Sequence, residues 1–174
     1  MTRKLSLTPD ISYMLGIYSA NRKDSQPIRI DSRSKDVVEK FIKIAIGDLA
    51  VEPQKIMTGE HWACFYNSKI KKLFGRALER RIKTFKYFNE YSGSYVAGLF
   101  DCSGGMDRKG IFIRNLDAHD GLLLENIGIH TRAQGSKSYI IDEKRLVSLI
   151  SGYSCIMRGL MPGRQQRRRP ATSL

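Results

Sequence analysis

Several features that would narrow the class of this protein are scarce in its sequence. The 174 residues include three cysteines and one tryptophan, and no run of about 18 apolar residues that would cross a membrane. Cys64, Cys102 and Cys155 are odd in number and widely spaced, which excludes a disulfide framework and a CxxC metal knuckle. No apolar signal segment follows the basic residues 1–5. We therefore expect a cytoplasmic protein with reduced thiols and no membrane partner.

Acidic residues are also few. Asp and Glu number 17 against 30 Lys and Arg, which gives a net charge of +13 and an isoelectric point near 9.9. Such an excess indicates a polyanionic partner, with nucleic acid as the first candidate and an anionic membrane surface as the second. A basic protein without a polyanion partner is the alternative, because net charge alone identifies no ligand.

The sequence does contain a glycine-centred apolar segment that occurs twice. Residues 95–105 read YVAGLFDCSGG, and residues 13–21 read YMLGIYSAN, with tyrosine, apolar, glycine and small positions in the same order. In a helix, residues four apart lie on one face, and each segment has a small pair at this spacing: Gly16 with Ala20, and Gly98 with Cys102. Such faces allow two backbones to approach closely. We interpret the repeat as an internal duplication.

Both halves of the chain show the same order of predicted elements, which is helix, strand, helix, strand, strand, helix. Periodicity and turn signals place them at 8–21, 27–31, 36–46, 54–57, 61–66 and 70–85, then at 95–103, 110–114, 118–127, 129–132, 137–141 and 143–151. This order predicts a mixed α/β fold of the α+β type, with antiparallel sheets. It also predicts two pseudo-twofold related repeats and a central pair of close-packed helices.

The expected domain organisation follows from the same pattern. The first repeat spans residues 1–84, an aromatic connector spans 85–91, and the second repeat spans 92–154. Residues 155–174 are rich in glycine, proline and arginine and are expected to form a flexible basic tail. The tail either adds attraction for phosphates or is a frayed terminus. The internal pseudo-symmetry favours a monomer.

The two motif helices resemble those of the LAGLIDADG family of homing endonucleases and intron maturases. The match is close at VAGLFD, residues 96–101, and weaker at MLGIYS, residues 14–19; with both halves it covers residues 8–153. The resemblance implies motif helices packed at a pseudo-twofold axis and sheets that form a saddle on DNA. Two ordinary helices with chance glycines are the alternative, although glycine is about 1 kcal/mol less favourable than alanine inside a helix.

The sequence departs from the family at the positions that carry cleavage. In the family, the last acidic residue of each motif binds a divalent ion, and the matching residues here are Asn21 and Ser103. Neutral side chains are poor ligands for Mg²⁺, so we expect no metal site, no cofactor and no catalytic residue. An active Mg²⁺-dependent endonuclease, the alternative, would have to use Asp101, Asp24 or Asp107. Only a dozen residues follow each motif before the next helix, which predicts a narrow saddle with one strand or a very short hairpin at this point.

We therefore predict a protein that binds DNA or structured RNA and has lost nuclease chemistry; a protein-interaction scaffold is a further alternative. Basic residues on strand faces and in adjoining turns are expected to contact phosphates: Arg22, Lys23, Arg29, Lys55, Arg108, Lys109, Arg114, Arg132 and Lys137. Phe112 and Tyr139 would either stack on unpaired bases or pack internally. Helix 70–85 also has a basic face, which is either a solvated surface or a second polyanion contact: Lys69, Lys71, Lys72, Arg76, Arg80 and Lys83.

Overall fold

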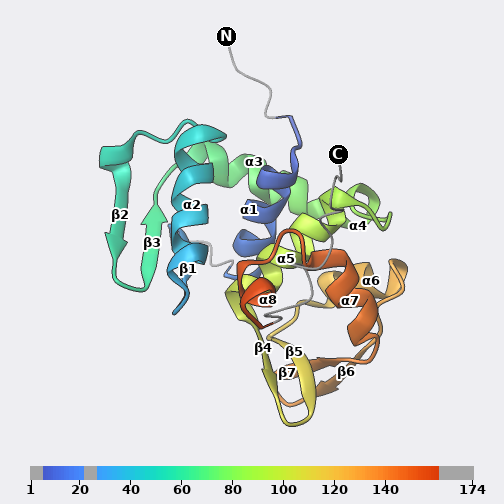
Figure 1. The fold of residues 1–174 in the computed structure, drawn as a ribbon. Coiled ribbons are helices and arrows are strands. Elements are labelled where there is room, and N and C mark those ends of the chain that lie inside the picture. Colours follow the sequence, from blue (N-terminus) through green and yellow to red (C-terminus); the bar gives the residue numbers. More distant parts are fainter. Residues whose placement is uncertain (1–5, 22–26, 161–174) are drawn as a thin grey trace, which may run out of the picture.

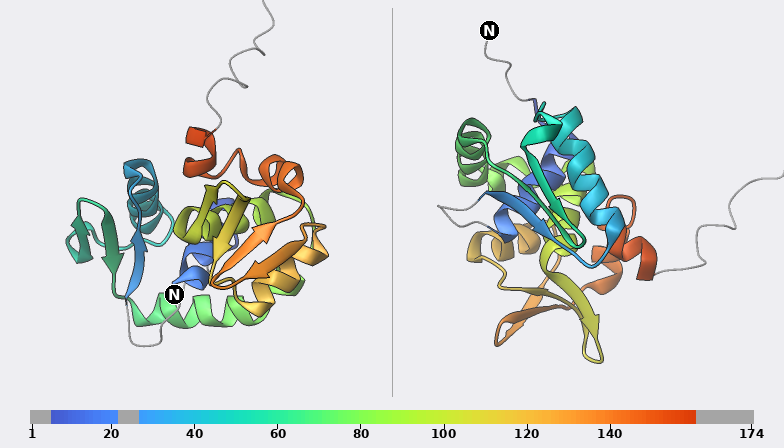
Figure 2. Two further views of the ribbon diagram at one scale, coloured as in Figure 1. Left: turned by 90° about the horizontal axis from the view of Figure 1, so that it is seen from below. Right: turned by 90° about the vertical axis from the view of Figure 1, so that its left-hand side faces the viewer.

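The computed structural model describes residues 6–21 and 27–160, and two sheets in it flank a central pair of helices (Figure 1). The central helices are α1 (Pro9–Ala20) and α5 (Glu90–Ser103), which correspond to the two motif segments. Two further views show one sheet on each side of this pair (Figure 2). The predicted fold class and the central pair of packed helices are therefore confirmed. Among the described residues, no helix is long and apolar enough to span a membrane.

The elements follow the chain in two similar series. After α1 come β1 (Ile28–Asp31), α2 (Lys35–Gly47), the 3₁₀ helix η1 (Pro53–Lys55), β2 (Ile56–Gly59), β3 (Trp62–Phe65) and α3 (Ser68–Glu79). The short helix α4 (Arg81–Thr84) leads to the second half. After α5 come β4 (Gly104–Asp107), β5 (Gly110–Arg114), α6 (Ala118–Asn126), β6 (Thr131–Gln134), β7 (Lys137–Ile140), α7 (Glu143–Ile150) and α8 (Cys155–Leu160).

The two sheets are antiparallel but differ in width. Within the described residues, the first sheet has the strand order β1-β3-β2 and the second β4-β5-β7-β6. Strand β4 corrects the prediction that both halves share one order of elements. The glycine pair ends α5, with Gly104 as its C-cap, and it also forms this strand, because Gly104 and Gly105 pair with Ile113 and Phe112. The very short hairpin allowed by the sequence is therefore present in the second half.

Local signals explain where the motif helices begin. The Thr8 side chain accepts a hydrogen bond from the Ile11 N–H at 3.1 Å, and Pro9 occupies the first turn. Helix α5 begins at Glu90, earlier than its apolar pattern indicates. There Asn89 and Ser92 form a capping box, with each side chain bonded to the backbone of the other residue.

Two other boundaries differ from the predicted ones. The helix expected over residues 70–85 divides at Arg80 into α3 and α4. The flexible tail was expected from residue 155, but residues 155–160 form α8, in which Met157 is buried. Residues 161–174 lie outside the described residues. Within the aromatic connector, Phe85 is buried in the core, whereas Tyr87 and Phe88 are exposed.

Candidate nucleic-acid interface and motif helices

Gly16 and Gly98 set the distance between the two motif helices. A Cβ atom on Gly16 would lie 2.0 Å from the carbonyl oxygen of Tyr95, and one on Gly98 would lie 2.1 Å from that of Tyr13. Real side chains do not tolerate such distances to a backbone atom, so this packing requires glycine at both positions. The contacts are reciprocal, because each glycine meets the tyrosine three residues before the other. The predicted close approach of two related helices is confirmed.

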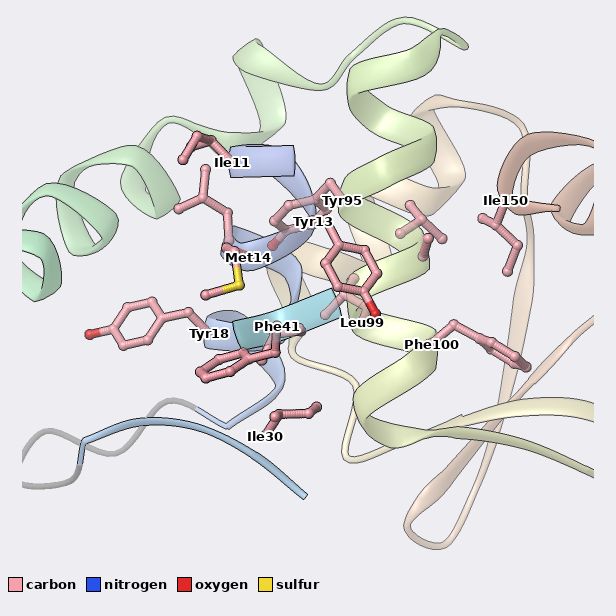
Figure 3. Packing of buried hydrophobic residues seen from close by; sticks show 14 of the residues in the cluster. Ile11, Tyr13, Met14, Tyr18, Ile30, Phe41, Tyr95, Leu99, Phe100 and Ile150 are labelled. Atoms are coloured by element: carbon pink, nitrogen blue, oxygen red, sulfur yellow. The ribbon is translucent and has the colours of Figure 1, made fainter. Parts of the chain in front are cut away.

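Both tyrosines also donate to a buried carboxylate, Tyr13 across the helix pair and Tyr95 to a residue of α6. The Tyr13 hydroxyl donates to Asp101 at 2.8 Å, and the Tyr95 hydroxyl donates to Asp120 at 2.6 Å. Ser19 donates to the same Asp120 carboxylate at 2.7 Å. Figure 3 shows both tyrosines within the packed interior around α1 and α5. Burial, followed by the adjacent carboxylate, raises the pKa of each tyrosine, so both hydroxyls remain protonated donors.

Asp101 is committed to internal hydrogen bonds. It is 2% exposed, and besides Tyr13 it accepts from the Ser154 hydroxyl and from the Cys155 N–H at 2.8 Å. The Ile156 N–H also lies within bonding distance of it, at 3.3 Å. These N–H groups open α8, so the Asp101 carboxylate caps that helix from another part of the chain. Its role in the structure is to hold α8 on α5.

The second buried carboxylate has a cationic partner instead. Asp120 is 1% exposed, and Arg81 Nε lies 2.9 Å from its Oδ1 atom. The Nε–H does not point at this oxygen, so the contact is an ion pair rather than a hydrogen bond. Arg81 also donates to Asp117 Oδ1 at 2.7 Å and to the Leu78 carbonyl at 2.9 Å. Arg81 interrupts the apolar periodicity of its segment because it neutralises carboxylates contributed by α6 and the residue before it.

One face of the second sheet collects basic and aromatic side chains. Cross-strand pairing places Phe112 opposite Tyr139 and Arg114 opposite Lys137, so their side chains share one face. Arg132 pairs with Tyr139 on the other side of β7. The alternate residues Ile111 and Ile113 belong to the hydrophobic core, so this face points away from the helices. We call this set, Phe112, Arg114, Arg132, Lys137 and Tyr139, the second-sheet face.

The aromatic rings of the second-sheet face are covered by its cations. Phe112 is 3% exposed and Tyr139 7% exposed. The Lys137 ammonium lies 4.2 Å and the Arg114 guanidinium 5.3 Å from the centre of the Phe112 ring. These distances are typical of cation–π contacts. The rings pack internally, as one of the two sequence interpretations held, and they position the cations above them.

The first sheet has a corresponding but more acidic face. Register places Arg29 opposite Cys64, and Asp31 opposite Trp62, while Ile28 and Ile30 alternate with them into the core. The Arg29 guanidinium lies 4.7 Å from the centre of the Trp62 ring and donates to both oxygens of Asp31, at 2.7 and 2.6 Å. We call Arg29, Asp31 and Trp62 the first-sheet face.

This architecture matches solved structures of the homing endonuclease I-DmoI. A structure from a study of its mesophilic variants has a TM-score of 0.59 and 16% identity, covering 83% of this chain and 96% of that one. A complex of I-DmoI with DNA and Mn has a TM-score of 0.57 and 17% identity, covering 83% of this chain and 97% of that one. A complex with DNA and Ca has a TM-score of 0.60 and 16% identity, covering 89% of this chain and 98% of that one. The chain has the LAGLIDADG endonuclease fold. No protein-family model and no curated protein matches the sequence, so the likeness is one of fold.

In this LAGLIDADG fold, the ends of the motif helices carry neutral residues that are already bonded. The Asn21 side-chain amide donates to the Arg29 carbonyl at 3.0 Å, and the Ser103 hydroxyl donates to the Leu99 carbonyl at 2.9 Å. Asp31 is the nearby carboxylate that the sequence reasoning missed, and both its oxygens accept from Arg29. Together with burial, which is the larger cause, its charge raises the pKa of Cys102 to about 12.

The donor set at the helix ends does not fit a divalent cation. Such ions take anionic or water oxygens, and here an amide, a hydroxyl and an arginine-paired carboxylate are available. No group of three or more His, Cys, Asp or Glu side chains within residues 6–21 and 27–160 is arranged to hold a metal. Of the carboxylates considered as substitutes, Asp101 is buried in the cap of α8, and Asp24 lies outside the described residues.

Asp107, the third candidate substitute, belongs to the tip of the β4–β5 hairpin. Its carboxylate accepts from Lys137 at 2.7 Å, from the Lys109 N–H at 2.9 Å and from the Tyr139 hydroxyl at 2.9 Å. These bonds, with that from Lys137 the strongest, lower the pKa of Asp107 to about 2. Asp107 is therefore an ionised partner of the second-sheet face and not a group at the helix ends.

The structure places seven of the nine predicted phosphate contacts, in four locations. Arg114, Arg132 and Lys137 lie together on the second-sheet face, and Arg29 lies on the first-sheet face. Arg108 and Lys109 form the β4–β5 turn, where Lys109 also bonds to Gln134 at 3.1 Å. Lys55 lies apart, in η1, and pairs with Glu52 at 2.9 Å. Arg22 and Lys23 lie outside the described residues.

Proposed function

We propose that this chain binds nucleic acid on its two sheet faces and has lost metal-dependent cleavage. The observation that carries the loss of cleavage is the chemistry of the two helix ends. Asn21 and Ser103 are neutral, and each already donates to a backbone carbonyl. Without anionic ligands, the electrostatic stabilisation of a dication beside phosphates is missing.

Binding is supported by the cations that remain on the sheets. The second-sheet face holds Arg114 and Lys137 over the Phe112 ring, so these side chains are ordered before a partner arrives. Ordered cations lose less conformational entropy when they contact phosphates. I-DmoI, which shares this fold, has been solved in complex with DNA. Together these observations support duplex DNA as the first ligand to test.

A charge-matched pair of variants tests the binding surface. Arg114→Gln/Arg132→Gln/Lys137→Gln removes three cations from the second-sheet face. The control removes three exposed cations from helices α2 and α7, Lys35→Gln/Lys43→Gln/Lys144→Gln. In titrations of labelled duplex DNA against salt, we expect the sheet triple to lower the slope of log K on log salt by roughly 3 and the control to leave it nearly unchanged. Equal changes in both variants would exclude the sheet face as the binding site.

Cleavage is tested directly with a library of DNA duplexes incubated with Mg²⁺ or Mn²⁺. We expect no products beyond those of a chelator control. Products that disappear in an Asp31→Asn or Asp107→Asn variant would contradict the proposed loss of cleavage and would identify the carboxylate that replaced the motif acids. Both residues are exposed, so these variants are expected to fold.

A further inference from the structure

A second basic surface lies on α3 and α4. Figure 2 shows α3 along one flank of the molecule, away from the exposed faces of the two sheets. Within α3, Glu79 is the single acidic residue. The exposed cations of this flank are Lys69, Lys72, Arg76, Arg80 and Lys83, and Lys71 is partly buried among them. Repulsion between so many like charges disfavours the bare surface and favours a polyanion on it.

The basic flank is hollowed where it meets α1 and the end of β3. A groove of about 620 Å³ is lined by Tyr18, Tyr66, Ser68, Lys69, Lys71, Lys72, Gly75, Arg76 and Glu79. We call it the α3 groove. Tyr66 is 63% exposed, and the Lys71 ammonium lies 6.0 Å from the centre of its ring. An aromatic ring open to solvent among cations is the arrangement on which an unpaired base stacks while its phosphates are neutralised.

Gly75 is an independent observation on the same groove. It lies inside α3, where glycine is less favourable than alanine. A Cβ atom there would meet no atom within 4 Å, whereas one at Gly16 or Gly98 would collide with the partner backbone. Internal packing therefore does not require this glycine. Gly75 lines the groove, and its missing side chain leaves room there for a ligand to approach the helix backbone.

We propose that the α3 groove binds a single-stranded segment of nucleic acid, separately from the two sheet faces. Lys69, Lys72 and Arg76 contact consecutive phosphates, Tyr66 stacks on an unpaired base, and the strand passes over Gly75. A duplex keeps its base faces stacked on one another, so the Tyr66 ring adds nothing to duplex binding. The residues of this groove are not shared with either sheet face, and the proposal stands whether or not the sheets bind DNA.

The first experiment measures binding of a labelled oligouridylate of about 12 nucleotides, a length in the range of known single-strand sites. We expect Lys69→Gln/Lys72→Gln/Arg76→Gln to weaken binding at least tenfold. The control Lys35→Gln/Lys43→Gln/Lys144→Gln carries the same net charge and is expected to bind like the wild type. Equal losses in the two triples, equal loss in the sheet-face triple, or no binding by the wild type would each overturn the proposal.

Two single substitutions distinguish a specific binding site in the α3 groove from nonspecific electrostatic attraction of phosphates. Tyr66→Ala is expected to weaken oligouridylate binding roughly tenfold and to leave duplex DNA binding unchanged. Gly75→Leu is expected to raise thermal stability and yet to weaken oligouridylate binding, because the side chain fills the groove. A Gly75→Leu variant that binds with unchanged affinity would overturn the proposal. So would binding of phosphatidylserine vesicles through this flank in the absence of oligouridylate binding.

Discussion

The two motif helices have equivalent backbones but stabilise their buried charges differently. Gly16 and Gly98 meet the opposite tyrosine carbonyl at nearly the same distance, and both tyrosines donate to a buried carboxylate. At one end the carboxylate is Asp101, which lies on α5 itself and accepts hydrogen bonds from backbone N–H groups of α8. At the other end it is Asp120, which belongs to α6.

The residue equivalent to Asp101 in the first motif explains this difference. It is Ser19, also three residues after the motif glycine, and its hydroxyl donates to Asp120. The acceptor for the second tyrosine thus comes from a neighbouring helix, and Arg81 supplies its counter-charge. The glycine and tyrosine contacts are therefore the shared part of the repeat, whereas the two buried carboxylates, both in the second half of the chain, are stabilised by different partners. The following predictions test that contrast.

The largest effect is expected from Asp120→Asn. This change removes one of the two carboxylates that pair with the buried Arg81 guanidinium and leaves only Asp117. Removing one partner of a buried ion pair destabilises a protein by about 3–5 kcal/mol. Urea unfolding gives the loss in free energy directly. Adding Arg81→Met to Asp120→Asn is expected to restore part of the stability, since the buried cation that faced Asp120 is then gone. No recovery in the double variant would show that the ion pair is not the source of the effect.

Alanine at Gly16 and alanine at Gly98 are expected to destabilise the protein by similar amounts. Gly16→Ala and Gly98→Ala each force a methyl group against a carbonyl oxygen, and overpacking of this kind destabilises by roughly 1–3 kcal/mol or more. Gly75→Ala is the matched control, because its added methyl group meets nothing and removes a helix-disfavouring glycine, for a gain of up to about 1 kcal/mol. Thermal unfolding of the three variants makes the comparison. Clearly unequal losses at Gly16 and Gly98 would contradict the equivalence of the two contacts.

Asp101→Asn is expected to act locally. The amide retains the shape of the carboxylate but weakens charge-assisted hydrogen bonds to Ser154 and Cys155, a loss of about 1–3 kcal/mol. Because these bonds hold α8, the Cys155 thiol should react faster with a labelling reagent, while the buried Cys64 thiol of the first sheet keeps its rate. A parallel increase at both thiols would mean that Asp101 supports the whole fold rather than α8.

The sequence predicted what depends on short-range pattern. The glycine positions, the Thr8 cap and the alternation of Ile28 and Ile30 identify the helices and the strand they belong to, because each signal lies within a few residues of its effect. Local pattern could not reveal β4, since Gly104 and Gly105 form a strand only by pairing with β5.

The chemistry of the buried carboxylates was equally beyond local pattern. Arg81 is visible in the sequence as an exception on an apolar stripe, but its partners come from α6. Asp101 was considered as a motif acid with a possible metal role. Its partners Ser154 and Cys155 lie more than 50 residues away, and Cys155 begins the segment expected to be a flexible tail.

The smallest expected effect concerns Asp107 on the second-sheet face. Its pKa is lowered to about 2, first by the hydrogen bond from Lys137. The unfolded chain has a carboxyl pKa near 3.9, so the unfolded state binds the proton first as pH falls. The contribution of Asp107 is therefore full above about pH 4 and is lost toward pH 2. Urea midpoints measured across this window should fall less steeply for Asp107→Asn than for the wild type. Because the carboxylate is exposed, the difference between the two proteins is expected to be small. A difference that is present in low salt and disappears in high salt would show that screening removes the Lys137 contact.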